Sequence, residues 1–210
     1  MLDRHTFQAV GLAGSVAIVT AATLLRYWQR PSELAHEVEH EEAGAEAKHG
    51  EESDAKGAPT APAARKVEGS WTPGIYPIPE DEEERMKLLR SLDILDSAAE
   101  AAFDHITNWG RHFYEVPICV VTLVDADRQW FKACYGLAAL ETDRDVAFCA
   151  HAIMPGAPDV FEVCDATEDV RFANNPLVVG APFIRYYAGA PLLMEGRKLG
   201  TLCILDTDYH

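Results

Sequence analysis

The stretch that most constrains the fold is a continuous run of apolar and β-branched residues, Ile118–Val124, directly after Pro117. Branched side chains pack well on a pleated surface, and a short unbroken apolar run is typical of a central, buried strand. Asp125–Arg128 has the composition of a turn, and Gln129–Tyr135, closed by Gly136, indicates an antiparallel return. The sequence therefore predicts a hairpin within an antiparallel sheet.

Three further segments predict strands of the same sheet. Val160–Cys164 is short, Ile184–Leu193 is longer, and Leu199–Leu205 follows the longer segment after a turn at Glu195–Gly196. Strands that follow one another through turns pair in antiparallel fashion. Because helical patterns come before the strands, we expect an α+β fold with five or six strands.

Two helices are expected ahead of the sheet. Glu80–Glu84 places carboxylates in a first helical turn, where they complement the helix dipole, and we interpret this charge run as a solvated face. A second helix is expected to begin at Ser97, because Ser97 and Glu100 form the pattern of a capping box. Apolar residues then recur every three or four positions as far as Phe113.

The N-terminal region contains an uncharged segment, Phe7–Leu25. Its 19 residues would span about 28 Å as a helix, close to the thickness of a hydrocarbon core. Aromatic and basic residues at 26–30 suit a membrane interface, and their position predicts the downstream chain on the cytoplasmic side. We expect residues 1–30 to form a single-pass membrane anchor. A secretory signal, an organelle-targeting presequence on a soluble protein and a buried soluble helix are the alternatives.

Between the expected anchor and the folded domain, apolar periodicity disappears. Residues 31–76 are rich in Ala, Glu, Gly, Pro and His, and such a segment buries too little apolar surface to offset its ordering entropy. We therefore predict an acidic, disordered linker at 31–76 and a folded domain at 77–210. His36, His40 and His49 are interpreted as solvated residues rather than metal ligands.

Charge and cysteine content exclude some functions. The net charge of −16 argues against nucleic-acid binding, because phosphate contacts need clustered Lys and Arg. The five cysteines include no C-x-x-C pair, which indicates a reducing compartment without a disulfide framework. Metal ligation by Cys149, His151 and Cys164 is not supported by their spacing, and we expect no metal site.

The segment Asp145–Ile153 holds the residues with the most chemical potential, Cys149 and His151. A reactive thiolate needs a cation, a base or a helix N-terminus beside it. However, side chains two positions apart on a helix point in different directions. We therefore interpret Cys149 as a packed residue and His151 as a hydrogen-bonded one, with a redox role for Cys149 as the alternative.

Several short motifs follow one another along the predicted sheet and its loops. They are Asp93–Asp96, Phe103–Asp104, Leu123–Asp125, Arg128–Lys132, Phe148–Ile153, Asp165–Asp169, Arg171–Leu177, Tyr187–Leu192 and Gly200–Cys203 with Asp206. Together they resemble a GAF domain of the type found in bacterial signalling proteins such as sensor kinases and cyclic-dinucleotide enzymes. The resemblance covers residues 79–206. It implies a central antiparallel sheet with helices on one face and pocket-forming loops on the other, here preceded by one N-terminal hydrophobic helix.

The resemblance also implies a function and a site. A membrane-tethered GAF module would regulate signal transduction by binding a small molecule, by dimerising, or both, without catalysis of its own. Its expected partners are a small-molecule ligand and either a second copy of the chain or a separate output protein. The residues expected to contact the ligand are Trp130, Cys149, His151, Arg171, Arg185 and Tyr187.

The sequence leaves several points open. Trp130 and Phe131 are neighbours on a strand, so only one of them can face the loops. Arg171 and Arg185 either form internal ion pairs with nearby aspartates or bind an anionic or polar ligand. The identity of the ligand and of any cofactor is not fixed. Besides the sensor, a thiol-based redox enzyme or redox sensor using Cys149 and a degenerate scaffold that only dimerises are alternatives.

Overall fold

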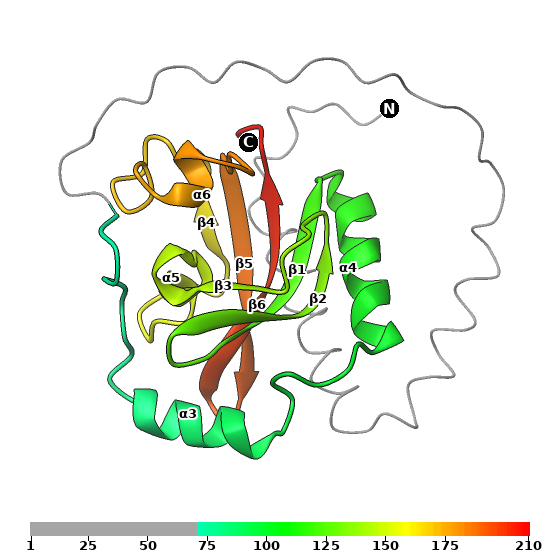
Figure 1. The fold of residues 1–210 in the computed structure, drawn as a ribbon, viewed down its shortest axis with the longest axis vertical. Helices are drawn as coiled ribbons and strands as arrows, with labels where there is room; N and C mark the ends of the chain where they lie inside the picture. The colour runs from blue at the N-terminus through cyan, green and yellow to red at the C-terminus, as the bar shows by residue number, and fades with distance from the viewer. Residues whose placement is uncertain (1–70) are drawn as a thin grey trace, which may run out of the picture.

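The computed structural model describes residues 71–210 and shows one antiparallel sheet with helices packed on it (Figure 1). The helices are α3 (Glu82–Ser91), α4 (Ala101–Tyr114), α5 (Cys149–Ala152) and α6 (Pro176–Val179), with a 3-10 turn, η3 (Arg144–Val146). The strands are β1 (Ile118–Val124), β2 (Arg128–Tyr135), β3 (Glu141–Asp143), β4 (Phe161–Val163), β5 (Tyr186–Met194) and β6 (Arg197–Asp206). Their order is β3-β2-β1-β6-β5-β4; the expected antiparallel sheet of five or six strands is confirmed, with six.

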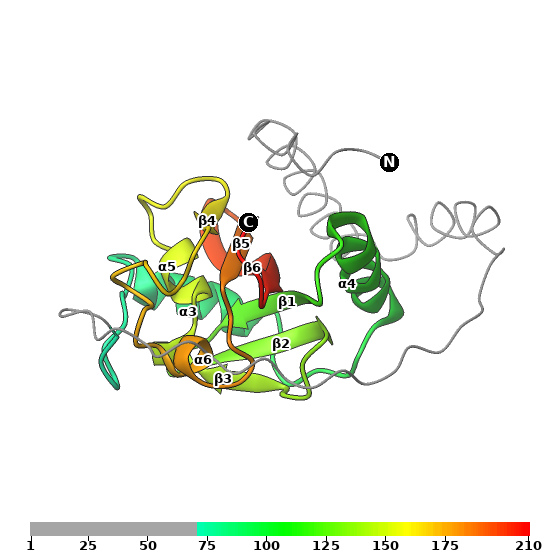
Figure 2. The same cartoon turned by 90° about the horizontal axis from the view of Figure 1, so that it is seen from above.

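Strand β1 lies inside the sheet, between β2 and β6, and all of its residues are buried. Its side chains alternate between two apolar clusters, because successive residues of a strand point to opposite faces. Val121 and Leu123 join the cluster beneath α3 and α4, while Val120 and Val124 join the cluster beneath α5. Figure 2 shows α4 and α5 on opposite sides of the sheet. The unbroken apolar run is thus explained by burial on both faces.

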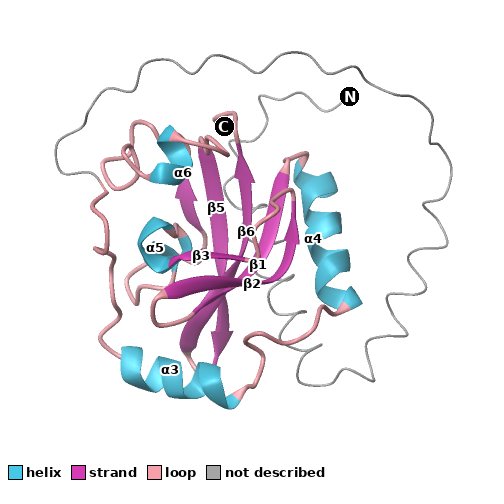
Figure 3. Cartoon of the chain, viewed as in Figure 1, coloured by secondary structure: helices cyan, strands magenta, loops and turns pink. Residues whose placement is uncertain are grey.

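Strands β5 and β6 form the long hairpin of the sheet (Figure 3). Helix α3 lies near the turn of this hairpin, where the side chains of Asp81 and Arg197 form an ion pair. Helix α4 runs beside β1 and β2. The C-terminal half of the chain therefore supplies the scaffold on which the earlier helices pack.

Helix α4 begins at Ala101, so the expected capping box at Ser97 is wrong. The N-cap residue is Glu100, and its side chain makes no capping hydrogen bond. The hydroxyl of Ser97 instead donates to the carbonyl of Ile94 at 2.6 Å and accepts from Lys132 Nζ at 2.8 Å. Glu100 forms an ion pair with the same Lys132. Ser97 and Glu100 therefore both bind the buried Lys132 of β2 instead of capping the helix. Because Lys132 is distant in sequence, the local pattern could not show this.

The acidic start of α3 is only partly a solvated face, which corrects the interpretation from sequence. Arg85 and Arg144 are each only 1% exposed, and both donate to the carboxylate of Glu82. Arg85 also donates to Val124 O at 2.7 Å, and Arg144 donates to Asp125 O at 2.9 Å. Burial raises the pKa of Glu82, but the hydrogen bonds from the two guanidinium groups outweigh it and lower the pKa to about 2.

The predicted membrane anchor at residues 7–25 and the linker as far as residue 70 lie outside the described residues. Between residues 71 and 210, no helix is both long and apolar enough to cross a bilayer. Membrane attachment, the cytoplasmic orientation and the domain boundaries stay predictions. Residues 71–76, which were assigned to the linker, contact the folded domain through Trp71, Gly74 and Tyr76.

Replacing Glu82 with Gln should lower the free energy of unfolding by about 3 kcal/mol, because two buried guanidinium groups lose their carboxylate. Glu83→Gln is the matched control, since Glu83 and its partner Lys87 are 78% and 68% exposed, and should cost less than about 0.5 kcal/mol. Urea unfolding at neutral pH measures both, and equal stabilities would contradict the buried network.

The contribution of Glu82 is present above pH 4.5 and should be lost as the pH falls towards 2, so the stabilities of wild type and Glu82→Gln should converge there.

Candidate functional site

A cavity of about 380 Å³ opens between residues 71–77 and the loops that surround α5. Its wall combines aromatic rings with charged and amide groups. The lining residues are Trp71, Thr72, Ile75, Tyr76, Pro77, Asp145, His151, Arg171, Phe172 and Asn175. Because these residues come from three separate parts of the chain, the cavity exists only in the folded domain.

Asp145 holds the N-terminal side of the cavity in place. Its carbonyl accepts a hydrogen bond from Trp71 Nε1 at 2.8 Å, and its Oδ2 accepts one from the backbone N–H of Gly74 at 2.7 Å. Its Oδ1 is buried and has no hydrogen-bond partner among residues 71–210. The neighbouring Arg144 packs its guanidinium 5.0 Å from the centroid of the Tyr76 ring. A buried acceptor without a donor is costly, so this carboxylate is held in place at some cost in stability.

His151 and Arg171 form the opposite side of the cavity. Burial and, to a lesser extent, the positive charge of Arg171 lower the pKa of His151 to about 4, although Asp169 opposes the shift. The imidazole is therefore neutral at neutral pH. The Arg171 guanidinium donates from Nε and Nη2 to the two carboxylate oxygens of Asp169 at 2.9 and 2.6 Å. It also lies 5.3 Å from the centroid of the Phe172 ring. Arg171 thus forms an internal ion pair with Asp169, as the sequence allowed, and this pair holds the guanidinium at the cavity.

Arg185 has a different environment. Its Nη1 donates to Val178 O at 2.9 Å and to Ile184 O at 3.1 Å. These bonds tie the C-terminal part of α6 to the start of β5. Arg185 is not among the residues that line the cavity, so the structure does not place it with Arg171 and His151.

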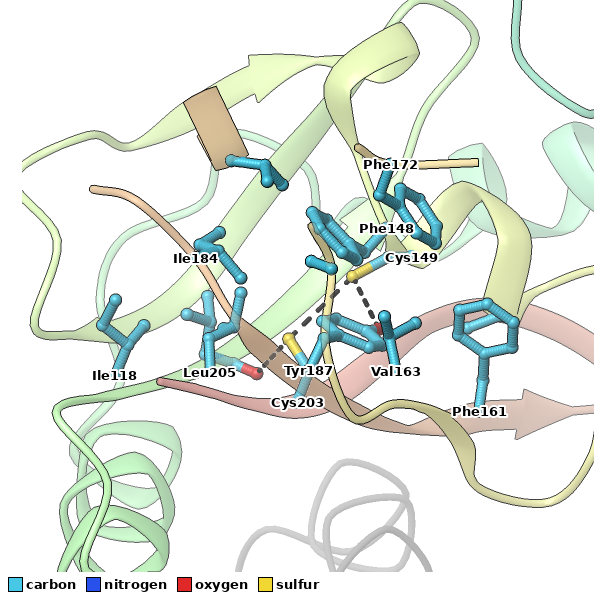
Figure 4. Close-up of a cluster of buried hydrophobic side chains, with 14 of the residues drawn as sticks. Ile118, Phe148, Cys149, Phe161, Val163, Phe172, Ile184, Tyr187, Cys203 and Leu205 are labelled. Atoms are coloured by element: carbon cyan, nitrogen blue, oxygen red, sulfur yellow. Dashed lines mark hydrogen bonds between the residues drawn. The ribbon is translucent and has the colours of Figure 1, made fainter. Parts of the chain in front are cut away.

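Cys149 and Tyr187 lie beneath the cavity, in the core between α5 and the sheet (Figure 4). The Tyr187 hydroxyl donates to Cys149 Sγ at 3.2 Å, and the Thr201 hydroxyl donates to the same sulfur at 3.0 Å. Aromatic rings fill the surrounding space: Phe148 stacks on Phe172 with ring centroids 4.0 Å apart. The space between α5 and the sheet is therefore packed with side chains, and the cavity lies outside it.

Trp130 is separated from the other predicted site residues. It lies on the opposite face of the sheet, in the cluster that contains Met86 and Leu89 of α3. Its neighbour Phe131 belongs to the cluster beneath α5. The alternation of strand side chains was correctly expected, but Phe131 is the residue of this pair that faces α5.

Sequence reasoning missed several residues of the cavity. Trp71 and Tyr76 fell in the segment assigned to the linker, although two aromatic residues near its end are unusual for a disordered composition. Asn175 caps α6 by accepting from Leu177 N, and its amide donates to Val146 O at 3.0 Å. It therefore connects α6 to η3. The sequence Asn175-Pro-Leu177 indicates a helix start, but the bond from Asn175 to Val146 joins residues 29 positions apart and leaves no local pattern.

A comparison of the sequence with models of known protein families identifies the family of this domain. The model described as "GAF domain" matches residues 98–210. The chain belongs to the GAF domain family. Helix α3, which precedes the matched range, packs on the same sheet as the rest of this GAF domain.

A curated relative is the cyclic di-GMP phosphodiesterase PA2567 of Pseudomonas aeruginosa, which is 44% identical over 133 residues. The match covers 63% of this chain and 22% of the relative, so the chain spans about a fifth of that protein. Among solved structures, the GAF domain of a phosphoenolpyruvate-protein phosphotransferase from Coxiella burnetii has a TM-score of 0.43 at 16% identity, covering 61% of this chain and 80% of that chain. The free methionine-R-sulfoxide reductase of Neisseria meningitidis has a TM-score of 0.42 at 17% identity, covering 60% and 74%.

The half-buried His151 should make the stability of this GAF domain depend on pH. Its pKa is about 4 in the folded chain and 6.5 when exposed, so the unfolded chain binds the proton first. The free energy of unfolding should therefore fall as the pH drops from 6.5 to 4. His151→Gln should remove about 2 kcal/mol of this decrease. Urea unfolding at several pH values measures it, with the exposed His112→Gln as control. Identical pH profiles for wild type and His151→Gln would contradict the burial of a neutral imidazole.

Proposed function

We propose that this chain is a sensory module in signal transduction whose GAF domain binds a small polar molecule in the cavity beside α5. The observation that carries the proposal is the cavity itself, which is lined by aromatic rings and has the acidic Asp145 on one side and the basic Arg171 on the other. Its volume of about 380 Å³ lies within the range of small-molecule sites. The curated relative is named for cyclic di-GMP hydrolysis, which supports a place for this module in cyclic-dinucleotide signalling.

The chemistry of the cavity suits a ligand with a planar ring and both donor and acidic groups. Trp71 and Tyr76, which are half-buried, offer ring surfaces for stacking, whereas Phe172 is buried behind the wall. The negative charge of Asp145 would attract a donor group of the ligand, and Arg171 would attract an anionic group. The aspartate and the arginine thus favour one orientation of the bound molecule.

The position of the cavity suits regulation. Residues 71–77 connect the upstream part of the chain to α3 and also form one wall of the site. A ligand that touches this segment and α5 together would hold the segment against the domain. Such binding shifts an equilibrium only as far as the two states differ in affinity. We propose no reaction at the cavity, because its polar groups suit recognition: a paired guanidinium, a neutral imidazole and a carboxylate.

The ligand proposal is tested on the full chain. Native mass spectrometry after mild purification should show a bound small molecule, and a thermal-shift series with cyclic di-GMP, cyclic GMP, cyclic AMP and GTP should identify stabilising nucleotides. Asp145→Asn and Trp71→Ala should each weaken binding of the stabilising compound about tenfold or more, a loss of about 1.4 kcal/mol. Asp143→Asn is the control, because Asp143 is exposed on β3 two residues away. No bound molecule and no thermal shift with any probe would contradict the proposal.

Self-association is a second candidate function, and α4 provides the observation that favours it. One side of α4 is buried against the sheet through Phe103, Thr107 and Gly110. Its outer side exposes Trp109 and Phe113, which are 45% and 54% exposed and stack with ring centroids 4.8 Å apart. Exposed aromatic pairs are enriched at protein interfaces. A second copy of the chain is the partner we propose for this surface.

If α4 mediates self-association, the full chain should sediment as a dimer at micromolar concentrations. The double substitution Trp109→Gln with Phe113→Gln should weaken the dimer at least about tenfold, because it removes the aromatic contact. Tyr209→Gln is the control, since Tyr209 is an exposed aromatic residue outside α4. A dimer unaffected by the double substitution, or a chain that stays monomeric, would speak against this candidate.

A further inference from the structure

Two thiols meet in the core beneath the cavity. Cys149 is the first residue of α5, and Cys203 lies on β6, the strand beside β1. Their Sγ atoms are 3.9 Å apart although 54 positions separate them in sequence (Figure 4). Both residues are buried, with 1% and 2% of their surface exposed. Core packing alone does not require two sulfur atoms to lie this close, so a reaction between the two thiols has to be considered.

Cys149 accepts hydrogen bonds that Cys119, another buried cysteine, does not share. Tyr187 and Thr201 both donate hydroxyl groups to Cys149 Sγ, at 3.2 and 3.0 Å. A neutral thiol is a weak acceptor, whereas hydroxyl donors strengthen when the sulfur carries a negative charge. Convergence of two hydroxyls on one sulfur therefore favours the thiolate, which is the nucleophilic form.

The titration of the neighbouring groups agrees with this geometry. Burial raises the pKa of Cys149, but hydrogen bonds from Cys203 and from nearby hydroxyl groups outweigh it and lower the pKa to about 7. The hydrogen bond to Cys149, with burial, raises the pKa of Cys203, and burial raises that of Tyr187. Both donors thus keep their protons while Cys149 loses its own. Burial raises the pKa of Cys119 to about 12, so burial alone has the opposite effect.

We propose that Cys149 is an oxidation site for small hydroperoxides, with Cys203 as its resolving partner. The Cys149 thiolate attacks one peroxide oxygen, the O–O bond breaks, and Cys149 becomes a sulfenic acid while the second oxygen leaves and takes up a proton. The Cys203 sulfur then attacks Cys149 Sγ, and the sulfenic oxygen leaves as water with the proton of Cys203. Two electrons pass from the two sulfurs to the peroxide, and the products are one disulfide, one water and one alcohol, or a second water from hydrogen peroxide.

The geometry requires only a small rearrangement. The two sulfurs must approach from 3.9 Å to the length of a disulfide, about 2.05 Å. Helix α5 has only four residues, and we expect it to move towards β6 as the bond forms. Hydrogen peroxide is close to water in size and would reach Cys149 through local opening of α5, whereas bulky thiol reagents would stay outside.

The disulfide would also affect the cavity. Helix α5 carries His151, which lines the cavity. Phe148, the residue before Cys149, stacks on Phe172, which is also a lining residue. Drawing α5 towards the sheet would therefore change the wall of the proposed ligand site. This consequence rests on the proposed function, whereas the oxidation itself does not and is tested separately.

The decisive experiment uses the full wild-type chain, so it does not depend on the folding of a variant. The chain is treated with hydrogen peroxide at neutral pH, quenched in acid, alkylated under denaturing conditions and digested for mass spectrometry. A linked pair of peptides containing Cys149 and Cys203 is expected, while Cys119 remains alkylated as the internal control for burial. If Cys149 and Cys203 stay fully alkylated after the exposed Cys164 is oxidised, the proposal is overturned.

Matched variants assign the two roles. In Cys203→Ser, Cys149 should stop at the sulfenic acid and be trapped by dimedone, whereas Cys149→Ser should leave Cys203 unoxidised. Tyr187→Phe should slow the oxidation about fivefold at pH 7, the loss of thiolate expected for a pKa rise of about one unit. Tyr186→Phe is the control, because its hydroxyl donates to Glu162 instead. Equal rates for Tyr187→Phe and wild type would overturn the assignment of Cys149 as the attacking thiol.

Discussion

A single carboxylate, that of Glu82, joins three parts of this domain. It accepts hydrogen bonds from Arg85 on its own helix and from Arg144 of η3, and the same guanidinium groups donate to carbonyls at the end of β1 and in the following turn. Hydrophobic residues of similar volume could fill this space with equal stability. They would not fix the orientation of η3, however. Asp145 follows Arg144 directly, so the wall of the cavity depends on this buried charge cluster.

Much of the fold could be predicted because it rests on local patterns. The apolar run of β1 and the turn residues between strands are readable from neighbouring positions, and they gave the antiparallel sheet. The buried arginines could not be predicted, because charged residues are normally exposed and the partner of Arg144 lies 62 positions away. The true start of α4 was missed for a related reason, since Lys132 occupies the hydroxyl of Ser97 from a distant strand.

The candidate site was less predictable than the fold. Alternation along β2 showed that Trp130 and Phe131 face opposite sides, but which side meets α5 depends on how the helices pack. The environment of Cys149 is set by Tyr187 and Thr201, which lie 38 and 52 positions away. Trp71 belongs to a segment whose composition indicates disorder, although its indole donates to Asp145. Convergence of distant residues is a property of packing and leaves no local pattern.

The strand order has a consequence for how this domain behaves beside copies of itself. The two edges of the sheet are β3 and β4, each only three residues long. Both carry acidic side chains, Glu141 and Asp143 on one edge and Glu162 on the other. Short, charged edges present few free backbone groups and repel identical edges, which disfavours aggregation by edge-to-edge strand pairing. Crowding many such domains together would therefore favour defined contacts between helices over fibre growth.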